Sequence, residues 1–359
     1  MRRITQTFGF LAAVLSLAGA ADAATPGVER ELPLSPTPLW VVSAAWGPSG
    51  DLLVVDALSR QVFRYPLAGG LGAEVEAWRQ ASVKPGRPGV IVSGGGRYAI
   101  EADTAHLAYL DDRLAFAGEL DVADATRGPR GEVATLYDWA LTGEHLVAFS
   151  DIKLPGTASG KEEWISGFVK IPLAAPGQFE ILRRVGLDDS ERGYYLLGLR
   201  LLTTVGDEAY LLSMSSTPRL GRVTSNGGPE LALSVPAALA GATVPELEHP
   251  QGFGKEGVVD LFQRLEQASI PAGLYGWGGS LWLLGRAPAG DGGTRWSLTR
   301  VDPASGESGG TFVLPTTAPH VTVVPGDPYW AIIEKGRVEG FGKQEVLGAL
   351  LVSGAALAR

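Results

Sequence analysis

The sequence predicts an all-β fold, most specifically a six-bladed β-propeller, with a seven-bladed ring as the alternative. Its 49 Gly and 24 Pro residues are spread along the 359-residue chain, and they separate short apolar runs rich in Val, Leu, Tyr and Trp. This pattern is typical of many short strands joined by tight turns. Runs with helical spacing are scarce, whereas one turn-and-strand unit recurs six times along the chain.

Each of the six units places a Gly-containing turn before a short apolar strand. The turns contain, in chain order, Gly50, Gly96, Gly143, Gly206, Gly279 and Gly326. They lie about 46, 47, 63, 73 and 47 residues apart, and a spacing near 45 with several strands per unit is typical of propeller blades. One such blade cannot bury both of its faces, so we expect the six units to pack radially into a closed ring.

The two wide spacings predict insertions, one at about residues 151–167 and the other at about residues 236–273. Within the second, apolar residues at helical spacing over positions 258–265 predict a short amphipathic helix. Near the other end of the chain, residues 30–34 are expected to form a strand that completes the last blade and closes the ring.

The first 23 residues are predicted to be a cleavable secretory signal peptide. They comprise a basic pair at residues 2–3, an apolar run at residues 8–20 and a small-x-small cleavage sequence at residues 21–23. The apolar run is shorter than the roughly 20 residues of a transmembrane helix, which favours cleavage over an uncleaved anchor. We therefore expect a periplasmic or secreted protein whose single propeller domain spans residues 24–359.

Composition limits the classes of partner. The net charge of −9 and the isoelectric point of about 5.1 argue against nucleic acids and anionic membranes, since both require a basic face. No apolar run after the signal reaches spanning length, so we expect no membrane span in the mature protein. The chain has no cysteine, which excludes disulfides and a lipoprotein anchor. The ring must therefore close by strand pairing and packing.

The clearest unit runs from Trp46 to Asp56 and continues from Val62 to Tyr65. It contains a Gly turn, an apolar strand, an Asp, and a strand that ends at an aromatic residue. This unit resembles an NHL-type blade. The resemblance implies the six-bladed propeller superfamily, which also holds gluconolactonase-like lactonases, strictosidine-synthase-like proteins and many binding modules. It further implies that Asp56 caps a turn.

The lactonase branch of that superfamily holds a divalent cation in its central tunnel with Glu, Asp and Asn side chains. The chain has a single Asn, Asn226, and it lies in a hairpin-turn sequence with Gly227 and Gly228, so we do not expect this cation site. None of the four His has a partner at metal-ligand spacing, and the hydrolase sequence G-x-S-x-G is absent. We therefore predict no metal and no cofactor.

Candidate ligand-binding residues lie on or just before the predicted inner strands, which would line the central channel. They are Trp40, Asp138, Arg200, Tyr275 and His320. The loops before the inner strands share one face of a propeller, so these side chains are expected at the channel mouth. Aromatic and polar groups together suit a sugar, a peptide or another flat ligand. The alternative is that the aromatic rings pack between blades.

The function that this pattern favours is an exported, non-catalytic propeller that binds a small-molecule ligand or a protein. The alternative is a hydrolase or lactonase of the six-bladed type with its site at the channel mouth, an assignment that rests on analogy of fold. A third hypothesis is an assembly component that holds its partner with the insertion at residues 236–273.

Overall fold

The computed structural model describes residues 25–81, 89, 91–94, 97–103, 106–121, 133–142, 145–154, 163–173, 178–185, 194, 199–214, 218–223, 231–232, 244, 264–290, 292–339 and 343–358. The predicted signal peptide and most of the predicted insertion at residues 236–273 lie outside these residues. The statements below concern the described part of the chain.

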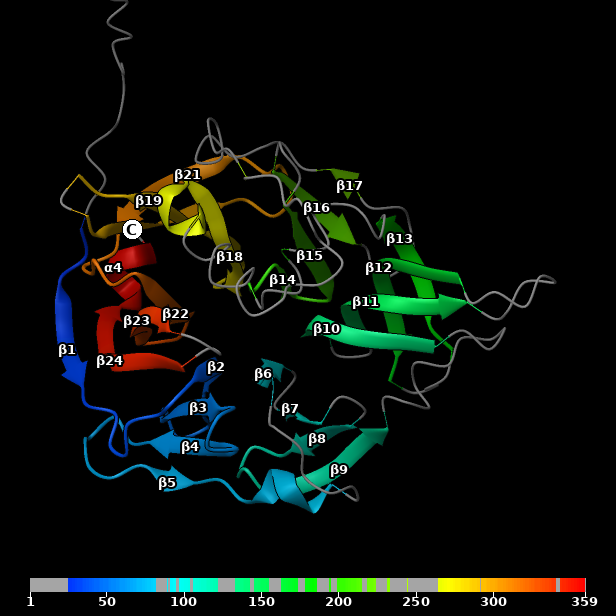
Figure 1. Ribbon diagram of the computed structural model, residues 1–359, viewed down its shortest axis with the longest axis horizontal. Helices are drawn as coiled ribbons and strands as arrows, with labels where there is room; N and C mark the ends of the chain where they lie inside the picture. Colours follow the sequence, from blue (N-terminus) through cyan, green and yellow to red (C-terminus); the bar gives the residue numbers. More distant parts are fainter. Residues whose placement is uncertain are drawn as a thin grey trace, which may run out of the picture.

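The described strands form six antiparallel sheets of four strands each, arranged as a ring around a central axis (Figure 1). In five of the sheets the strands follow one another in chain order, from the innermost to the outermost. This arrangement is a six-bladed β-propeller, and it confirms the predicted fold. Short apolar strands separated by turns produce it because each hairpin pairs locally and each sheet buries its faces against its neighbours.

The first half of the ring contains three blades. Blade 1 consists of β2 (Val41–Trp46), β3 (Leu52–Asp56), β4 (Gln61–Tyr65) and β5 (Ala73–Glu74). Blade 2 consists of β6 (Ile91–Gly94), β7 (Arg97–Asp103), β8 (His106–Leu110) and β9 (Phe116–Asp121). Blade 3 consists of β10 (Val133–Leu141), β11 (His145–Leu154), β12 (Glu163–Pro172) and β13 (Glu180–Val185).

The second half completes the ring. Blade 4 consists of β14 (Leu202–Val205), β15 (Glu208–Ser213), β16 (Arg219–Val223) and β17 (Leu231–Ala232). Blade 5 consists of β18 (Ile270–Trp277), β19 (Ser280–Pro288), β20 (Thr294–Val301) and β21 (Ser308–Val313). Blade 6 consists of β22 (His320–Val324), β23 (Tyr329–Glu339), β24 (Lys343–Ser353) and β1 (Val28–Leu32).

Blade 6 closes the ring with strands from both ends of the described chain. Strand β1 lies antiparallel to β24, with Glu31 opposite Leu350 and Leu32 opposite Ala349. The sequence predicted this closing strand at residues 30–34, so the element is confirmed and begins two residues earlier. Since the chain has no cysteine, this ladder and the packing beneath it hold the ring shut.

Each of the six predicted Gly turns lies between the first and second strand of a blade. Gly50 and Gly206 have φ angles of 77° and 60°, in the left-handed region that favours glycine. Gly326 is required for a different reason, because an added Cβ would overlap the indole ring of Trp46 in the neighbouring blade. The repeated glycine therefore marks a real structural position in the four blades where it is described, whereas Gly96 and Gly143 lie outside the described residues.

The hydrophobic core lies between the blades. At the junction of blades 5 and 6, the rings of Trp282 and Trp330 pack edge to face with their centroids 5.2 Å apart. Trp277 packs against Trp330 in the same manner at 5.4 Å. Offset and edge-to-face packing of this kind adds to the stabilisation from buried area. Large aromatic side chains therefore fill the wedge between these two blades.

The two ends of the insertion predicted at residues 151–167 belong to strands: residues 151–154 to β11 and residues 163–167 to β12. Residues 155–162 between them lie outside the described residues. Strands β11 and β12 stay paired from His145 opposite Pro172 to Leu154 opposite Glu163. Strand β11 is buried from Leu146 to Ile152, and each further residue pair continues the same ladder.

Helices are short in the described part of the chain. They comprise η1 (Ala77–Gln80), the turn at residues 264–267 and α4 (Gly354–Ala358). Within the described residues, no helix combines the length and the apolar character needed to cross a membrane. Of the helix predicted at 258–265, only the last two positions are described, and both are helical.

Candidate functional site

Inner strands of neighbouring blades present backbone N–H and C=O groups to one another. Side chains form hydrogen bonds with some of these groups. In blade 3, Asp138 Oδ2 accepts hydrogen bonds from the N–H groups of Leu201 and Leu202, at 2.9 and 3.0 Å. In blade 1, Ser43 Oγ accepts one from the N–H of Ile91 at 3.2 Å. Asp138 and Ser43 both follow a register shift in their strand. A bulge re-aims the side chain that follows it, which explains why both reach the next blade.

Blades 4 and 5 are joined through backbone groups near the axis. The N–H of Leu274 donates to the carbonyl of Arg200 at 2.8 Å, and the N–H of Gly276 donates to Thr203 Oγ1 at 2.8 Å. An added Cβ on Gly276 would overlap the carbonyl oxygen of Thr204. Glycine is therefore needed here for the close approach of two backbones.

A cavity of about 220 Å³ lies on the axis of the ring and is lined by all six blades. It is lined by Ala44, Ala45, Trp46, Ile91, Val92, Ser93, Ala140, Leu141, Arg200, Thr203, Thr204, Tyr275, Gly276, Trp277, Val324 and Pro325. We call this space the channel cavity. Most of these residues come from the later halves of the inner strands, so the cavity lies toward the hairpins that lead into the second strands.

The wall of the channel cavity is mainly apolar and includes two indoles. Trp46 is held by a hydrogen bond from its Nε1 to the carbonyl of Val324 at 3.2 Å. Trp277 is held by its packing against Trp330. Rigid aromatic rings with a few hydroxyl groups beside them are the usual lining of a small-molecule site.

Arg200 is the one charged residue among those described as lining the cavity. Its backbone is fixed by the bond to Leu274 and by the bridge to Gly273. Its guanidinium makes no hydrogen bond and no ion pair with any residue that the structure describes. A guanidinium carries five donors in a fixed planar fork, so this group is available to an incoming acceptor.

Asp138 and Tyr275 lie close enough to Arg200 to feel its charge. Asp138 is 6% exposed, and burial raises the pKa of its carboxyl to about 6, against the opposing effects of the amides that it accepts and of Arg200. Burial likewise raises the pKa of Tyr275 to about 12, again opposed by Arg200. The phenol therefore stays neutral at ordinary pH, and three of the predicted site residues lie together.

Trp40 lies apart from that group. Its backbone N–H donates to Asp56 Oδ1 at 3.0 Å, and the neighbouring backbone N–H of Leu39 donates to Asp56 Oδ2 at 2.8 Å. The N–H groups of Leu58 and Ser59 also donate to Asp56 Oδ1. Asp56 therefore caps the turn after β3, as the resemblance to an NHL-type blade implied. Trp40 is half-buried and is not among the residues that line the channel cavity.

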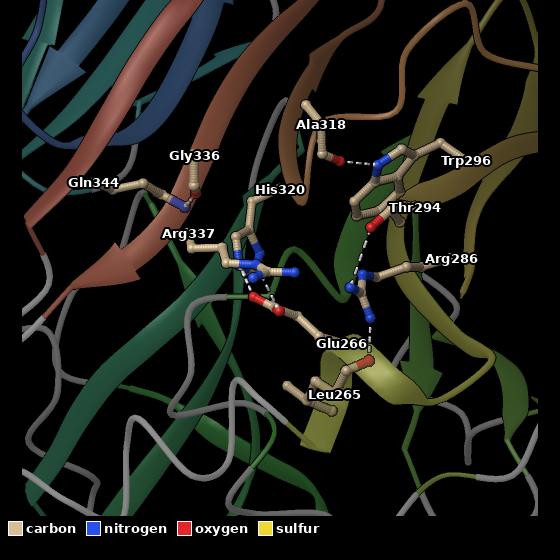
Figure 2. Close-up of polar contacts among 10 residues, drawn as sticks. All are labelled: Leu265, Glu266, Arg286, Thr294, Trp296, Ala318, His320, Gly336, Arg337 and Gln344. Carbon is tan, nitrogen blue, oxygen red and sulfur yellow. Dashed lines mark hydrogen bonds and ion pairs between the residues drawn. The ribbon is translucent and has the colours of Figure 1, made fainter. Parts of the chain in front are cut away.

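His320 belongs to a second polar group, at the junction of blades 5 and 6. Its Nε2 lies 3.1 Å from Glu266 Oε1, and Arg337 Nε lies 3.3 Å from Glu266 Oε2. Figure 2 shows both side chains directed at the carboxylate of Glu266, which comes from the helical turn before β18. We call Glu266, Arg286, His320, Lys335 and Arg337 the Glu266 cluster.

Arg286 extends the Glu266 cluster into the core. It is 5% exposed, and it donates to the carbonyl of Leu265 and to Thr294 Oγ1 (Figure 2). Its guanidinium also lies 5.8 Å from the centroid of the Trp296 ring. Every one of these partners belongs to the protein itself, which is the pattern of a structural arginine.

Burial and positive charge govern the titration of the Glu266 cluster. Burial lowers the pKa of His320 to about 3, and the charges of Lys335, Arg286 and Arg337 act in the same direction. The neutral imidazole therefore donates to the carboxylate of Glu266 without forming an ion pair. Burial also lowers the pKa of Lys335 to about 8.

The five residues predicted to form one channel mouth thus lie in three places. Asp138, Arg200 and Tyr275 gather beside the channel cavity, although Asp138 is not among its lining residues. Trp40 lies by Asp56, and His320 lies in the Glu266 cluster. Sequence reasoning missed Trp46 and Glu266 as members of these sites. Trp46 directly precedes a predicted Gly turn, a position that also holds Trp277 in blade 5, and this shared position was an available signal.

Within the residues that the structure describes, no group of three or more His, Cys, Asp or Glu side chains is arranged to hold a metal ion. The described lining of the channel cavity consists of an arginine, hydroxyl groups, aromatic rings and aliphatic residues.

Comparisons with known proteins support no assignment beyond the fold. No family model matches the chain, and no curated protein matches it. Among solved structures it is similar to virginiamycin B lyase from Staphylococcus aureus, with 10% identity and a TM-score of 0.41 over 90% of this chain and 98% of that one. It is similar to a puromycin-hydrolyzing peptidase of Mycobacterium tuberculosis, with 15% identity and a TM-score of 0.42 over 81% of this chain and 41% of that one. It is also similar to a protein designated a gluconolactonase, with 11% identity and a TM-score of 0.49 over 92% and 96%.

Proposed function

We propose that this protein is an exported, non-catalytic β-propeller that binds a small ligand in the channel cavity. The observation that carries the proposal is the cavity itself, which all six blades line and whose described lining includes Arg200. The backbone of Arg200 is held by blade 5, and its guanidinium has no hydrogen-bond or ion-pair partner among the described residues. A cavity of about 220 Å³ is below the roughly 300–1,000 Å³ of sites for drug-sized ligands, so the ligand is small.

The alternative is a hydrolase or lactonase with its site in the channel. Such chemistry needs an acid–base group, an activated nucleophile or a metal within hydrogen-bond reach of the substrate. Among the described residues that line the cavity, none is a carboxylate or an imidazole. The nearby carboxylate of Asp138 is engaged by the amides of Leu201 and Leu202. These features favour binding.

Ligand-observed NMR with a library of small neutral and charged fragments tests the proposal. We expect some fragments to bind the wild-type protein and to lose binding in Ser93→Trp, because Ser93 is exposed and lines the cavity. The matched control is Ser308→Trp on the outer strand β21, where residue 308 is also exposed. Binding that survives Ser93→Trp would contradict the proposal, and turnover of ester or lactone substrates that Ser93→Trp abolishes would favour the hydrolase.

Support for export comes from the basic, apolar and small-residue segments within residues 1–23. When the full chain is expressed in a bacterium and the cells are fractionated, we expect a periplasmic or secreted product that begins at Ala24. A chain of residues 24–359 should stay in the cytoplasm. An intact full-length mass in the cytoplasmic fraction would contradict the export of this protein.

A further inference from the structure

We infer that the ligand of the channel cavity is a small organic molecule with one carboxylate, held by the guanidinium of Arg200. This inference rests on the proposed function and specifies the chemical class of the ligand.

The backbone of Arg200 is held in place before any ligand arrives. Its carbonyl accepts the N–H of Leu274 in blade 5, and the next two N–H groups in the chain, of Leu201 and Leu202, donate to Asp138 in blade 3. Two neighbouring blades thus set the position of the backbone from which the side chain extends. Preorganisation of this kind lowers the entropic cost of binding.

Arg200 differs from the other arginines that the structure describes as buried or half-buried. There are five of these in the described residues, and four have a protein partner for the guanidinium. The partnered arginines are Arg64 with Asp51, Arg183 over the ring of Phe168, Arg222 with Glu208, and Arg286 with Leu265 and Thr294. Arg200 instead lines the cavity. A guanidinium that lines a cavity and has no acceptor among the described residues can offer its donors to an anionic ligand, and hydrogen bonds between charged groups are the stronger ones.

The surroundings of Arg200 favour a single negative charge. Asp138 lies near enough for its charge to interact with Arg200 and Tyr275. A ligand with two negative charges, such as a phosphate monoester, would be repelled by the ionised form of Asp138 and would find one guanidinium to neutralise it. A carboxylate matches the planar fork with two parallel hydrogen bonds.

The rest of the wall defines the body of the ligand. Beyond Arg200, the described lining consists of small aliphatic residues, the rings of Trp46, Trp277 and Tyr275, and the hydroxyl groups of serine and threonine. Such a wall accepts a compact apolar or aromatic body. Benzoate is therefore a suitable probe, with benzamide as its neutral isostere and phenyl phosphate as the dianionic alternative.

Isothermal titration calorimetry of these three probes tests the inference in wild type, Arg200→Gln and Arg200→Lys. We expect benzoate to bind the wild type, and Arg200→Gln to weaken that binding on the order of 10- to 100-fold. Arg200→Lys keeps the charge but loses the planar fork, so its loss should be smaller. The matched control is Arg295→Gln on the exposed side of β20, which should bind like wild type.

The other outcomes overturn the inference in different ways. Benzamide binding as tightly as benzoate, with no effect of Arg200→Gln, would refute the anionic class. The proposed function would still hold if Ser93→Trp abolished both. Preference for phenyl phosphate would refute the carboxylate in favour of a phosphate. Failure of all three probes would also refute the inference, and the proposed function fails with it only if the fragment library yields no ligand that Ser93→Trp displaces.

Discussion

The channel cavity and the Glu266 cluster contain similar side chains but use them differently. In the Glu266 cluster, the carboxylate of Glu266 contacts His320 and Arg337, and Arg286 donates to Leu265 and Thr294. In the channel, Arg200 has no such partner among the described residues. A buried or half-buried arginine is therefore not by itself evidence of a binding site. What distinguishes the channel cavity is a lining arginine whose guanidinium has no hydrogen-bond or ion-pair partner among the described residues.

The largest expected effect tests this distinction through stability. Arg286→Gln should lower the free energy of unfolding by about 2–4 kcal/mol, because it leaves a buried carbonyl without its donor and leaves Glu266 with one cation fewer. Arg200→Gln should change it by less than about 0.5 kcal/mol, since no protein partner is lost. Urea unfolding followed by circular dichroism measures both. Equal destabilisation by the two variants would contradict the comparison.

The next effect concerns the wall between blades 4 and 5. Gly276→Ala should lower the free energy of unfolding by about 1–3 kcal/mol, because the added Cβ overlaps the backbone of Thr204. Gly290→Ala is the matched control, since nothing lies within 4 Å of a Cβ at that position. Thermal unfolding of the two variants compares them directly. A neutral result for Gly276→Ala would show that the inner strands are further apart than described.

A smaller effect follows from the pKa of Asp138. Its pKa in the folded protein, about 6, is above its ordinary value of 3.8, so the folded state binds the proton more tightly. The resulting stabilisation is fully present below about pH 3.8 and is lost as the pH rises through about 6. Asp138→Asn should remove a slope of about 1–3 kcal/mol across that window, while its amide oxygen still accepts from Leu201 and Leu202. Urea unfolding at several pH values, compared with the wild type, measures the difference.

Asp138→Leu serves as the control for that measurement. It removes the acceptor together with the charge, so it should destabilise the protein at every pH. If Asp138→Asn and the wild type showed parallel pH dependence, the carboxyl would have an ordinary pKa, and its burial beside blade 4 would be in doubt.

The smallest expected effect is that His320, in the Glu266 cluster, does not titrate between pH 7 and pH 5. The pKa of His320 in the folded protein, about 3, is below its ordinary value of 6.5. The resulting stabilisation is present above pH 6.5 and is lost as the pH falls through about 3. The imidazole proton shifts of His320, followed by NMR from pH 7 to pH 5, below the pKa of Lys335, should therefore stay constant, whereas an exposed histidine titrates in that range. A midpoint near pH 6.5 would contradict the buried, neutral state.

Several features of this protein could be predicted from its sequence because they depend on neighbouring residues. Each of the six Gly turns joins two strands that are adjacent in the chain, so its position could be located from local pattern alone. Asp56 caps a turn formed by residues that follow it closely, and this role also follows from a short motif. The blade number came from counting such local units.

The tertiary structure alone decided which polar residues meet. Asp138 reaches amides 63 and 64 positions away, and His320 meets Glu266 across 54 positions. These contacts depend on where a register shift turns a side chain toward the next blade and on how closely two inner strands approach. Neither property leaves a periodic trace in the sequence. The sequence therefore determined the hairpins and their number, and the closure of the ring decided that Arg200 lines the cavity while His320 does not.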